Sequence, residues 1–339
     1  MNRKNSRGQI DFVITWVDGN DPVWRKEKNK YIASSEDDNR IQRFRDWNNL
    51  RYWFRGVEKF APYVHKIYFI TWGHIPAWLN TENKKLVIVN HKDYIPGYYL
   101  PSFNSNAIEL TMYKIKGLSE QFVYFNDDMF LIRGTKPTDF FCHGLPCDSA
   151  SLNVHCVDPN FGFNYAVYQA ISVINKYFPF HATLRKNWRK WFCPFYGKQL
   201  LRTLYLLPCP RFPGIYQTHI ANSFLKSTFE ELWEKEGKAF DETCRHRFRN
   251  KLDYSQWTMR NYQLASGRFW PRSMSFGKSF FLEKNKDSIE SVTLYIKKQM
   301  GKMIAINDGD LSDQEFLEDR KKVIDAFESI LPEKSEFEK

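Results

Sequence analysis

The sequence has no long apolar segment and few cysteines. No apolar run among its 339 residues reaches the 18 or so that a membrane-spanning helix needs. The first nine residues, MNRKNSRGQ, are polar and lack the apolar core of a secretory signal. The six cysteines are therefore expected to be reduced thiols, without disulfides. These absences predict a cytoplasmic protein whose contact with a membrane, where one exists, is peripheral.

Acidic residues are outnumbered, while aromatic residues are abundant. The 50 basic and 39 acidic residues leave a net charge of +11, which favours anionic partners such as nucleotide diphosphates, phosphorylated polymers, acidic lipid or nucleic acid. Aromatic residues make up 17% of the chain and suit ring-lined sugar sites. No recognisable nucleic-acid-binding motif occurs, so we expect no nucleic-acid partner.

Apolar strand-like runs alternate with helical patterns over the first 130 residues. Strands are expected at 10–17, 66–72, 85–90 and 122–131, and this order is typical of a doubly wound, mostly parallel α/β sheet. Four regions are expected: a polar tail at 1–9, an α/β region at 10–140, a basic, aromatic, largely helical insertion at 141–215, and a part at 216–339 that returns to the same core with further helices.

The run FVYFNDDMFL, residues 122 to 131, places three polar residues inside an apolar strand. Burying the carboxylates of Asp127 and Asp128 is costly unless a cation or several donors compensate them. A divalent metal is one solution. A tight turn in which Asn126 and Asp127 bond their own backbone is the other.

Other polar residues are ambiguous one at a time. Cys142, His143, Cys147, His155 and Cys156 are zinc-ligand types, but their spacing matches no common zinc pattern, so free thiols are favoured. Glu109 follows Asn106 by three residues and can complete a capping box, and Asp308 can be a turn residue.

Several segments taken together resemble the four conserved blocks of the Stealth family, in the family's order: IDFVITWVDGNDPVW, DDNRIQRFRDWNNLRYWFRGVEKFAPYVHKIYFITWGHIPAWLN, LPSFNSNAIELTMYKIKGLSEQFVYFNDDMFL, FPGIYQTHIANSFL with FDETCRHRFRNKLDYSQW, and AINDGD. That family comprises bacterial capsular and exopolysaccharide phosphotransferases and the animal Golgi enzyme that places N-acetylglucosamine phosphate on lysosomal glycoproteins. The chain is similar to the bacterial kind, which implies a location in the cytoplasm or at the inner face of the bacterial membrane.

The resemblance implies a modified Rossmann-like, glycosyltransferase-A-like core, with residues 10–140 binding a nucleotide sugar. It implies transfer of a sugar 1-phosphate from that donor, expected to be UDP-linked, to a hydroxyl of an oligo- or polysaccharide acceptor. The product is a phosphodiester. A metal-dependent glycosyltransferase that moves the sugar alone is the alternative.

The resemblance also assigns roles to individual residues. The expected catalytic residues are His219, Arg249, Asp128 and Glu109. The expected substrate-binding residues are Asp11, Trp16, Asp18, Arg51 and Asn126, and the expected ligands of a Mg²⁺ or Mn²⁺ cofactor are Asp127, Asp128 and Asp308. His219 takes the acceptor proton or forms a phosphohistidine, Arg249 binds the phosphoryl oxygens, and Glu109 orients His219 or binds the donor sugar.

Overall fold

A five-stranded sheet forms the centre of the chain in a computed structural model that describes residues 8–32, 45–156, 162–282, 287–309 and 311–339. Its strand order is β3 (Leu86–Asn90), β2 (Ile67–Thr71), β1 (Ile10–Thr15), β4 (Gln121–Phe125) and β8 (Asn222–Leu225). All neighbours are parallel except β4 and β8. The predicted α/β class with a mostly parallel sheet is confirmed.

Helices connect and cover the strands. The remaining strands are β5 (Met129–Leu131), β6 (Phe141–Cys142), β7 (Leu145–Asp148), β9 (Trp270–Pro271), β10 (Gly277–Leu282) and β11 (Met303–Asp308). The α-helices are α1 (Pro22–Asn29), α2 (Leu50–Phe60), α3 (Ser105–Thr111), α4 (Gly162–Tyr177), α5 (Phe180–Lys186), α6 (Trp188–Trp191), α7 (Gln199–Tyr205), α8 (Lys226–Arg245), α9 (Gln256–Ser266), α10 (Ile289–Lys297) and α11 (Asp313–Ile330). The 3₁₀ turns are η3 (His91–Asp93), η4 (Gly97–Tyr99), η5 (Met112–Lys114), η6 (Pro137–Asp139), η7 (Pro194–Tyr196) and η8 (Met274–Phe276).

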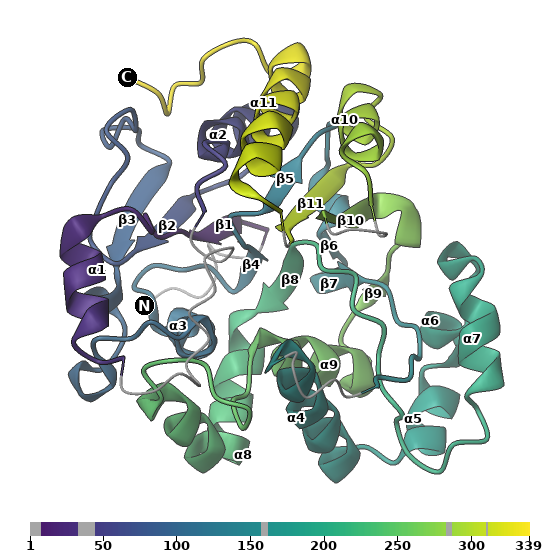
Figure 1. Cartoon of the computed structure of the whole chain (residues 1–339). Helices are drawn as coiled ribbons and strands as arrows, with labels where there is room; N and C mark the ends of the chain where they lie inside the picture. The colour runs from purple at the N-terminus through teal and green to yellow at the C-terminus, as the bar shows by residue number, and fades with distance from the viewer. Residues whose placement is uncertain (1–7, 33–44, 157–161, 283–286, 310) are drawn as a thin grey trace.

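The main sheet separates two apolar cores. Alternate residues of a strand point to opposite faces, so Phe12 and Ile14 of β1 pack in one core with α2 and α11. Val13 packs in the other core with α3, α8 and α9. Figure 1 shows the same layers, with α2 and α11 on one side of the sheet and α3, α8 and α9 on the other.

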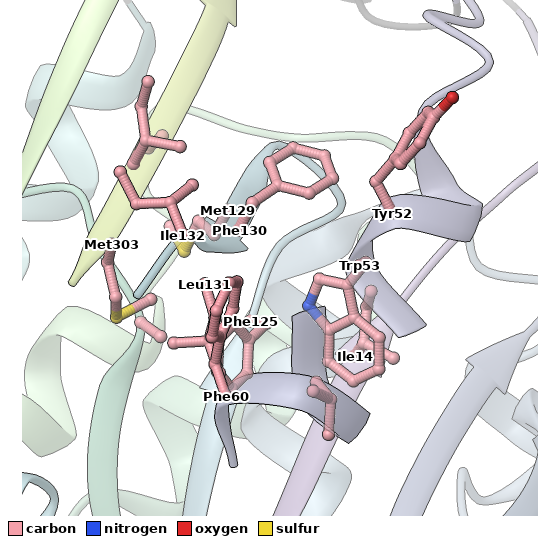
Figure 2. Close-up of a cluster of buried hydrophobic side chains, with 14 of the residues drawn as sticks. Ile14, Tyr52, Trp53, Phe60, Phe125, Met129, Phe130, Leu131, Ile132 and Met303 are labelled. Atoms are coloured by element: carbon pink, nitrogen blue, oxygen red, sulfur yellow. The ribbon is translucent and has the colours of Figure 1, made fainter. Parts of the chain in front are cut away.

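A second sheet, of order β10, β11 and β5, continues from the first through β5. Helix α2 packs closely on β5, because a Cβ on Gly56 would lie 2.9 Å from the carbonyl oxygen of Leu131. Figure 2 shows this junction, where Phe125 of β4 and Leu131 of β5 lie beside Trp53 and Phe60 of α2. The two sheets therefore share one apolar core.

Residues 331–339 close that core from outside. Arg55 of α2 donates to both carboxylate oxygens of Glu338, at 2.7 and 3.0 Å, and to the carbonyl of Leu331 at 2.8 Å. Phe337 is buried in the same core. The segment thereby fixes α2 on its solvent side.

The region predicted as a helical insertion begins with the hairpin β6–β7 and continues through α4, α5, α6, η7 and α7. It has its own apolar cluster, in which Trp191, Tyr196 and Phe212 pack with Leu264 and Phe269 from the segment around α9. Among the described residues, no helix is long and apolar enough to cross a membrane. Residues 1–7 of the expected polar tail lie outside the described part.

Several helix boundaries differ from the sequence expectation. Asn104, not Asn106, caps α3, so Glu109 is not part of a capping box and its carboxylate faces inward. Ser312 and Glu315 form a capping box at the start of α11, and Asp21 caps α1.

Asp11 lies at the start of β1, four residues before the end where neighbouring parallel strands terminate. It is fully buried. Its carboxylate accepts hydrogen bonds from the amides of Lys66 and Ser119, at 3.1 and 2.8 Å, and lies 2.8 Å from His65 Nδ1. These contacts tie the start of β1 to two loops, at the opposite end of the strand from Trp16 and Asp18, and the substrate-binding role of Asp11 stays a prediction.

Replacing Asp11 with alanine should reduce the free energy of unfolding by about 2–4 kcal/mol, since two buried amides lose their acceptor. Urea unfolding measures the loss. Asp18→Ala is the matched control, because among the described residues that carboxylate accepts only an exposed turn amide, from Asn20. This variant should change stability by less than about 1 kcal/mol. Equal losses in the two variants would contradict the structural role.

Candidate active site

The polar turn at 126–128 lies between the two sheets. Ile14 of β1 pairs with Phe125 of β4, so the residues after both strands emerge at the same edge. The amide of Met129 donates to the carbonyl of Asn126 at 3.2 Å. The amide of Ile306 donates to the carbonyl of Asp128 at 2.9 Å. The turn is thus held from both sides, and β11 ends two residues beyond this bond at Asp308.

Asp128 and His219 form a hydrogen-bonded pair. Asp128 Oδ2 lies 2.9 Å from His219 Nε2, and both side chains retain partial exposure. Burial lowers the pKa of His219, but the charge and hydrogen bond of Asp128 outweigh this effect and leave the pKa above its ordinary value. A carboxylate on Nε2 favours the tautomer with its proton there. Nδ1 then carries the free lone pair.

The loop before His219 is anchored by a buried ion pair. Arg260 donates to both carboxylate oxygens of Asp148, at 2.7 and 2.9 Å. Its remaining donors reach the carbonyl of Tyr216 at 3.1 Å and the side chain of Gln217 at 2.7 Å. His219 itself has a φ of 44°, a left-handed conformation that is uncommon for a non-glycine residue. The anchored loop therefore holds the imidazole in a specified orientation.

Glu109 lies in the same neighbourhood. It is buried, and it accepts hydrogen bonds from the Tyr124 hydroxyl and the Gln256 amide, both at 3.3 Å. Burial raises the pKa of Glu109, while the charges of Arg249 and His219 act in the opposite direction. Glu109, His219 and Arg249 are therefore close enough to interact electrostatically.

Arg249 reaches this group from the loop between α8 and α9. Its guanidinium donates through Nε to Ser105 Oγ at 2.9 Å, at the start of α3. Asn104 binds the loop by donating to the carbonyls of His246 and Phe248, at 3.2 and 3.3 Å. The loop thus presents a cation at the first turn of α3.

Buried Asp253 fixes the same loop. It accepts from Asn104 Nδ2 at 2.7 Å and from the amide of Asn250 at 2.9 Å, and it lies 2.6 Å from His246 Nδ1. Because these contacts satisfy both of its oxygens, Asp253 serves as the internal support of the Arg249 loop.

Asp127 is open to solvent but has protein atoms on many sides. Burial among these atoms and the charge of Asp128 raise the pKa of Asp127 to about 7. A carboxylate in this position is poorly compensated by the protein alone, and a bound cation would favour its charged form.

Asp308 is also poorly compensated. Arg45 Nη1 lies 3.9 Å from its Oδ1, beyond hydrogen-bond distance. Burial raises the pKa of Asp308 to about 6 despite the opposing charge of Arg45. Among the described residues, neither oxygen of Asp308 and only one oxygen of Asp128 has a hydrogen-bond partner of normal geometry.

The expected set of three metal ligands does not form a metal site in the described part of the chain, where no three His, Cys, Asp or Glu side chains converge enough to hold an ion. The unpaired oxygens of Asp128 and Asp308 are nevertheless hard donors of the kind that Mg²⁺ or Mn²⁺ prefers, and either residue would hold such an ion together with water and substrate. Mg²⁺ commonly uses only one or two carboxylates together with substrate phosphates.

The other expected substrate-binding residues are distributed unevenly. Trp16 follows β1 and stacks on Phe69, with ring centroids 5.7 Å apart. The amide of Asp18 donates to His74 Nε2 at 2.8 Å. Trp16 and Asp18 follow the carboxyl end of β1, as Asn126 follows that of the neighbouring strand β4. Arg51 lies over the ring of Trp78 at 5.6 Å. Within the described residues, no hydrogen bond or ion pair joins Arg51 to His219 or Asp128.

Relatives match nearly the whole chain. A capsular polysaccharide phosphotransferase, WcwK, of Streptococcus pneumoniae is 43% identical over 334 residues, which cover 98% of each chain. The chain belongs to the Stealth family. Models of Stealth conserved regions 1 and 2 match residues 8–36 and 43–147.

Two further Stealth-like relatives have related names. The exopolysaccharide phosphotransferase cps2G of Lactiplantibacillus plantarum is 41% identical and covers 97% of this chain and 96% of its own. The receptor polysaccharide phosphotransferase WefC of Streptococcus oralis is 36% identical, with 97% and 99% covered. Among solved structures, the galactosyltransferase LgtC in complex with donor and acceptor sugar analogues has a TM-score of 0.41 at 11% identity, with 94% of this chain and 96% of its own covered.

The matched Stealth regions contain Glu109, Asp127 and Asp128 but not His219, Arg249 or Asp308. His219 is joined to Asp128 by a hydrogen bond, and Arg249 interacts with Glu109 through its charge. Asp308 ends β11, two residues beyond the backbone bond between Ile306 and Asp128. Sequence reasoning missed the residues that position them, namely Arg45, Asn104, Asp148, Asp253 and Arg260. Of these residues, only Asp253 lies close in sequence to a residue that it contacts, because Asp253 and His246 share the segment RHRFRNKLD.

Replacing Asp308 with asparagine in this Stealth protein should stabilise the metal-free fold by about 1–3 kcal/mol at pH 7.5, since a costly buried charge is removed. Because the pKa of Asp308 is raised from 3.8 to about 6, its folded state favours the protonated form. The penalty is absent below about pH 4 and develops as pH rises through 6. The stability difference from the unaltered protein should therefore shrink as pH falls towards 4.

Asp313→Asn is the matched control, because Asp313 contacts the same Arg45 at 3.3 Å but its side chain is 91% exposed. Urea unfolding of the three proteins without metal, at several pH values, makes the comparison. A loss of stability in Asp308→Asn above pH 7 would contradict an uncompensated charge at this position.

Proposed function

We propose that the protein transfers a sugar 1-phosphate from a nucleotide sugar to a hydroxyl of an acceptor oligo- or polysaccharide, which makes a phosphodiester-linked capsular or extracellular polysaccharide. The observation that carries the proposal is the Asp128–His219 pair, which lies in electrostatic range of Glu109 and Arg249. Family membership supports it, because the similar proteins named above are polysaccharide phosphotransferases.

In the proposed reaction, an acceptor hydroxyl oxygen attacks the phosphorus next to the donor sugar. The bond from that phosphorus to the bridging oxygen breaks, and a nucleoside monophosphate leaves. The hydroxyl proton passes to Nδ1 of His219, and Asp128 stabilises the resulting imidazolium. The pKa of His219, raised by this carboxylate, suits the role of proton acceptor.

Arg249 supplies the positive charge for the phosphoryl oxygens. Its guanidinium is planar and always charged, so it can bind two oxygens at once. Glu109 acts as a positioning residue, since its negative charge attracts both Arg249 and His219. A Mg²⁺ or Mn²⁺ ion held by Asp128 and Asp308, with Asp127 beside it, would neutralise charge on the diphosphate.

Trp16, Asp18 and Asn126 are proposed to contact the donor, because they lie where parallel strands end and ligands of such sheets bind. UDP-linked sugars are the first donors to test. The alternative, transfer of the sugar alone, differs in the bond that breaks: attack at the anomeric carbon releases a nucleoside diphosphate and leaves no phosphorus in the product.

Purified protein incubated with UDP-sugars, Mg²⁺ and acceptor glycan should release uridine monophosphate. Phosphorus NMR of the product should show a phosphodiester. Release of uridine diphosphate, with a phosphorus-free product, would instead establish the glycosyltransferase. If the donor carries a phosphorus label next to the sugar, its retention on His219 in the absence of acceptor would replace the proton-acceptor role with a covalent phosphohistidine.

Replacing Arg249 with methionine should lower kcat/KM by about 100-fold or more, equivalent to about 3 kcal/mol of transition-state stabilisation. Arg245→Met is the control, because Arg245 is exposed and pairs with Asp241 four residues away on α8. Its kcat/KM should stay within about twofold of the unaltered enzyme, as expected for a surface ion pair. Similar losses in both variants would remove Arg249 from the mechanism.

A further inference from the structure

The excess positive charge of the chain is concentrated in one segment. Residues 159–229 contain nine Lys or Arg and no Asp or Glu. The remainder has 41 basic and 39 acidic residues and is nearly neutral. This segment includes α5, α6, η7 and α7, which Figure 1 shows at one end of the molecule, far from α1 and β3.

The same helices expose large apolar side chains. Trp188 of α6 is 56% exposed and Phe195 of η7 is 66% exposed. On α7, the exposed fractions are 69% for Leu201, 46% for Leu204 and 84% for Tyr205. We call these five residues the apolar docking face.

Helix α7 is inverted relative to an ordinary surface helix. Leu201, Leu204 and Tyr205 are spaced three and four residues apart, so they share one face, and that face points to solvent. The buried position is Thr203. Its hydroxyl accepts a hydrogen bond from the amide of Leu152 at 3.1 Å and lies 3.2 Å from Ser151 Oγ. These hydrogen bonds fix the helix with its apolar side outward.

Exposed basic side chains come from the same segment as the apolar docking face. Arg185, Lys186, Lys198 and Arg211 are exposed, and none forms an ion pair within the described part of the chain. The guanidinium of Arg189 lies 5.3 Å from the ring of Trp188. The four unpaired cations are available to an external anionic surface.

We propose that the apolar docking face and these four basic residues bind the surface of an anionic lipid bilayer. Leucine and aromatic side chains gain free energy by entering the boundary between headgroups and acyl chains, while Lys and Arg contact lipid phosphates. A soluble polyanion would satisfy the cations but leave the leucines in water. A second copy of this chain would bring two uniformly basic surfaces together.

The test is co-sedimentation of the full chain with vesicles of phosphatidylcholine alone or mixed with phosphatidylglycerol. Binding should require the anionic lipid and weaken at high salt. Because the assay uses no donor or acceptor, it stands or fails independently of the proposed reaction.

Two variants separate the contributions. Changing Arg185, Lys186, Lys198 and Arg211 to glutamine should weaken partition by about 600-fold if all four contact the surface, since each basic residue near an anionic surface contributes about fivefold. Changing Leu201, Leu204 and Tyr205 to serine should weaken it by about tenfold or more through lost apolar burial. Circular dichroism and thermal unfolding check that both variants fold.

Matched controls carry equal changes elsewhere. Lys84, Lys297, Lys298 and Lys321 to glutamine removes the same charge, and Leu294, Leu317 and Tyr98 to serine removes similar exposed side chains. Both controls should bind vesicles like the unaltered protein. Equal weakening by controls and docking variants would overturn the proposal.

Other results would also overturn it. Binding to dextran sulfate with no binding to anionic vesicles would make the face a polyanion site. Self-association that is lost in the serine variant, again without vesicle binding, would make it an interface between copies of this chain.

Discussion

The turn at 126–128 connects two sheets, and the site depends on its position. One side follows β4 in the main sheet, and the other begins β5, whose register with β11 is fixed by the bond between Ile306 and Asp128. The apolar side chains of Phe125 and Phe130 are fully buried on either side of the turn. Moving the carboxylates would therefore break packing and strand pairing together, which keeps Asp128 oriented towards His219.

The carboxylates of the fold and the candidate site fall into two groups. The carboxylates of Asp11, Asp148 and Asp253 are surrounded by donors that satisfy them, and such networks stabilise and specify the fold. Asp127 and Asp308 lack comparable partners, and their raised pKa values express that deficit. Because an uncompensated charge is unfavourable in the fold alone, its location marks the place where a cation or substrate completes the structure.

Sequence periodicity predicted β1, β2, β3 and β4, since each is a short apolar run. It did not predict β8, and it placed a single strand at 122–131 where a turn separates β4 from β5. Helix α8 is kinked at Glu236, whose φ of −122° and ψ of 21° are non-helical, and it continues beyond Gly237 because Phe240 packs in the core. No local sequence pattern encodes that long-range packing. His219 and Arg249 were inferred through family resemblance alone. Their partners Asp128 and Ser105 lie 91 and 144 residues away, a separation that no local pattern encodes.

The segment at 331–339 has a consequence for the order in which the chain can fold. Arg55 and Glu338 are 283 positions apart, yet their ion pair and the burial of Phe337 complete the packing of α2. During synthesis, α2 leaves the ribosome long before β11, α11 and this segment exist. The core around α2 must then remain incomplete until residues 331–339 have been synthesised, with apolar surface of α2 exposed to chaperones in the interval.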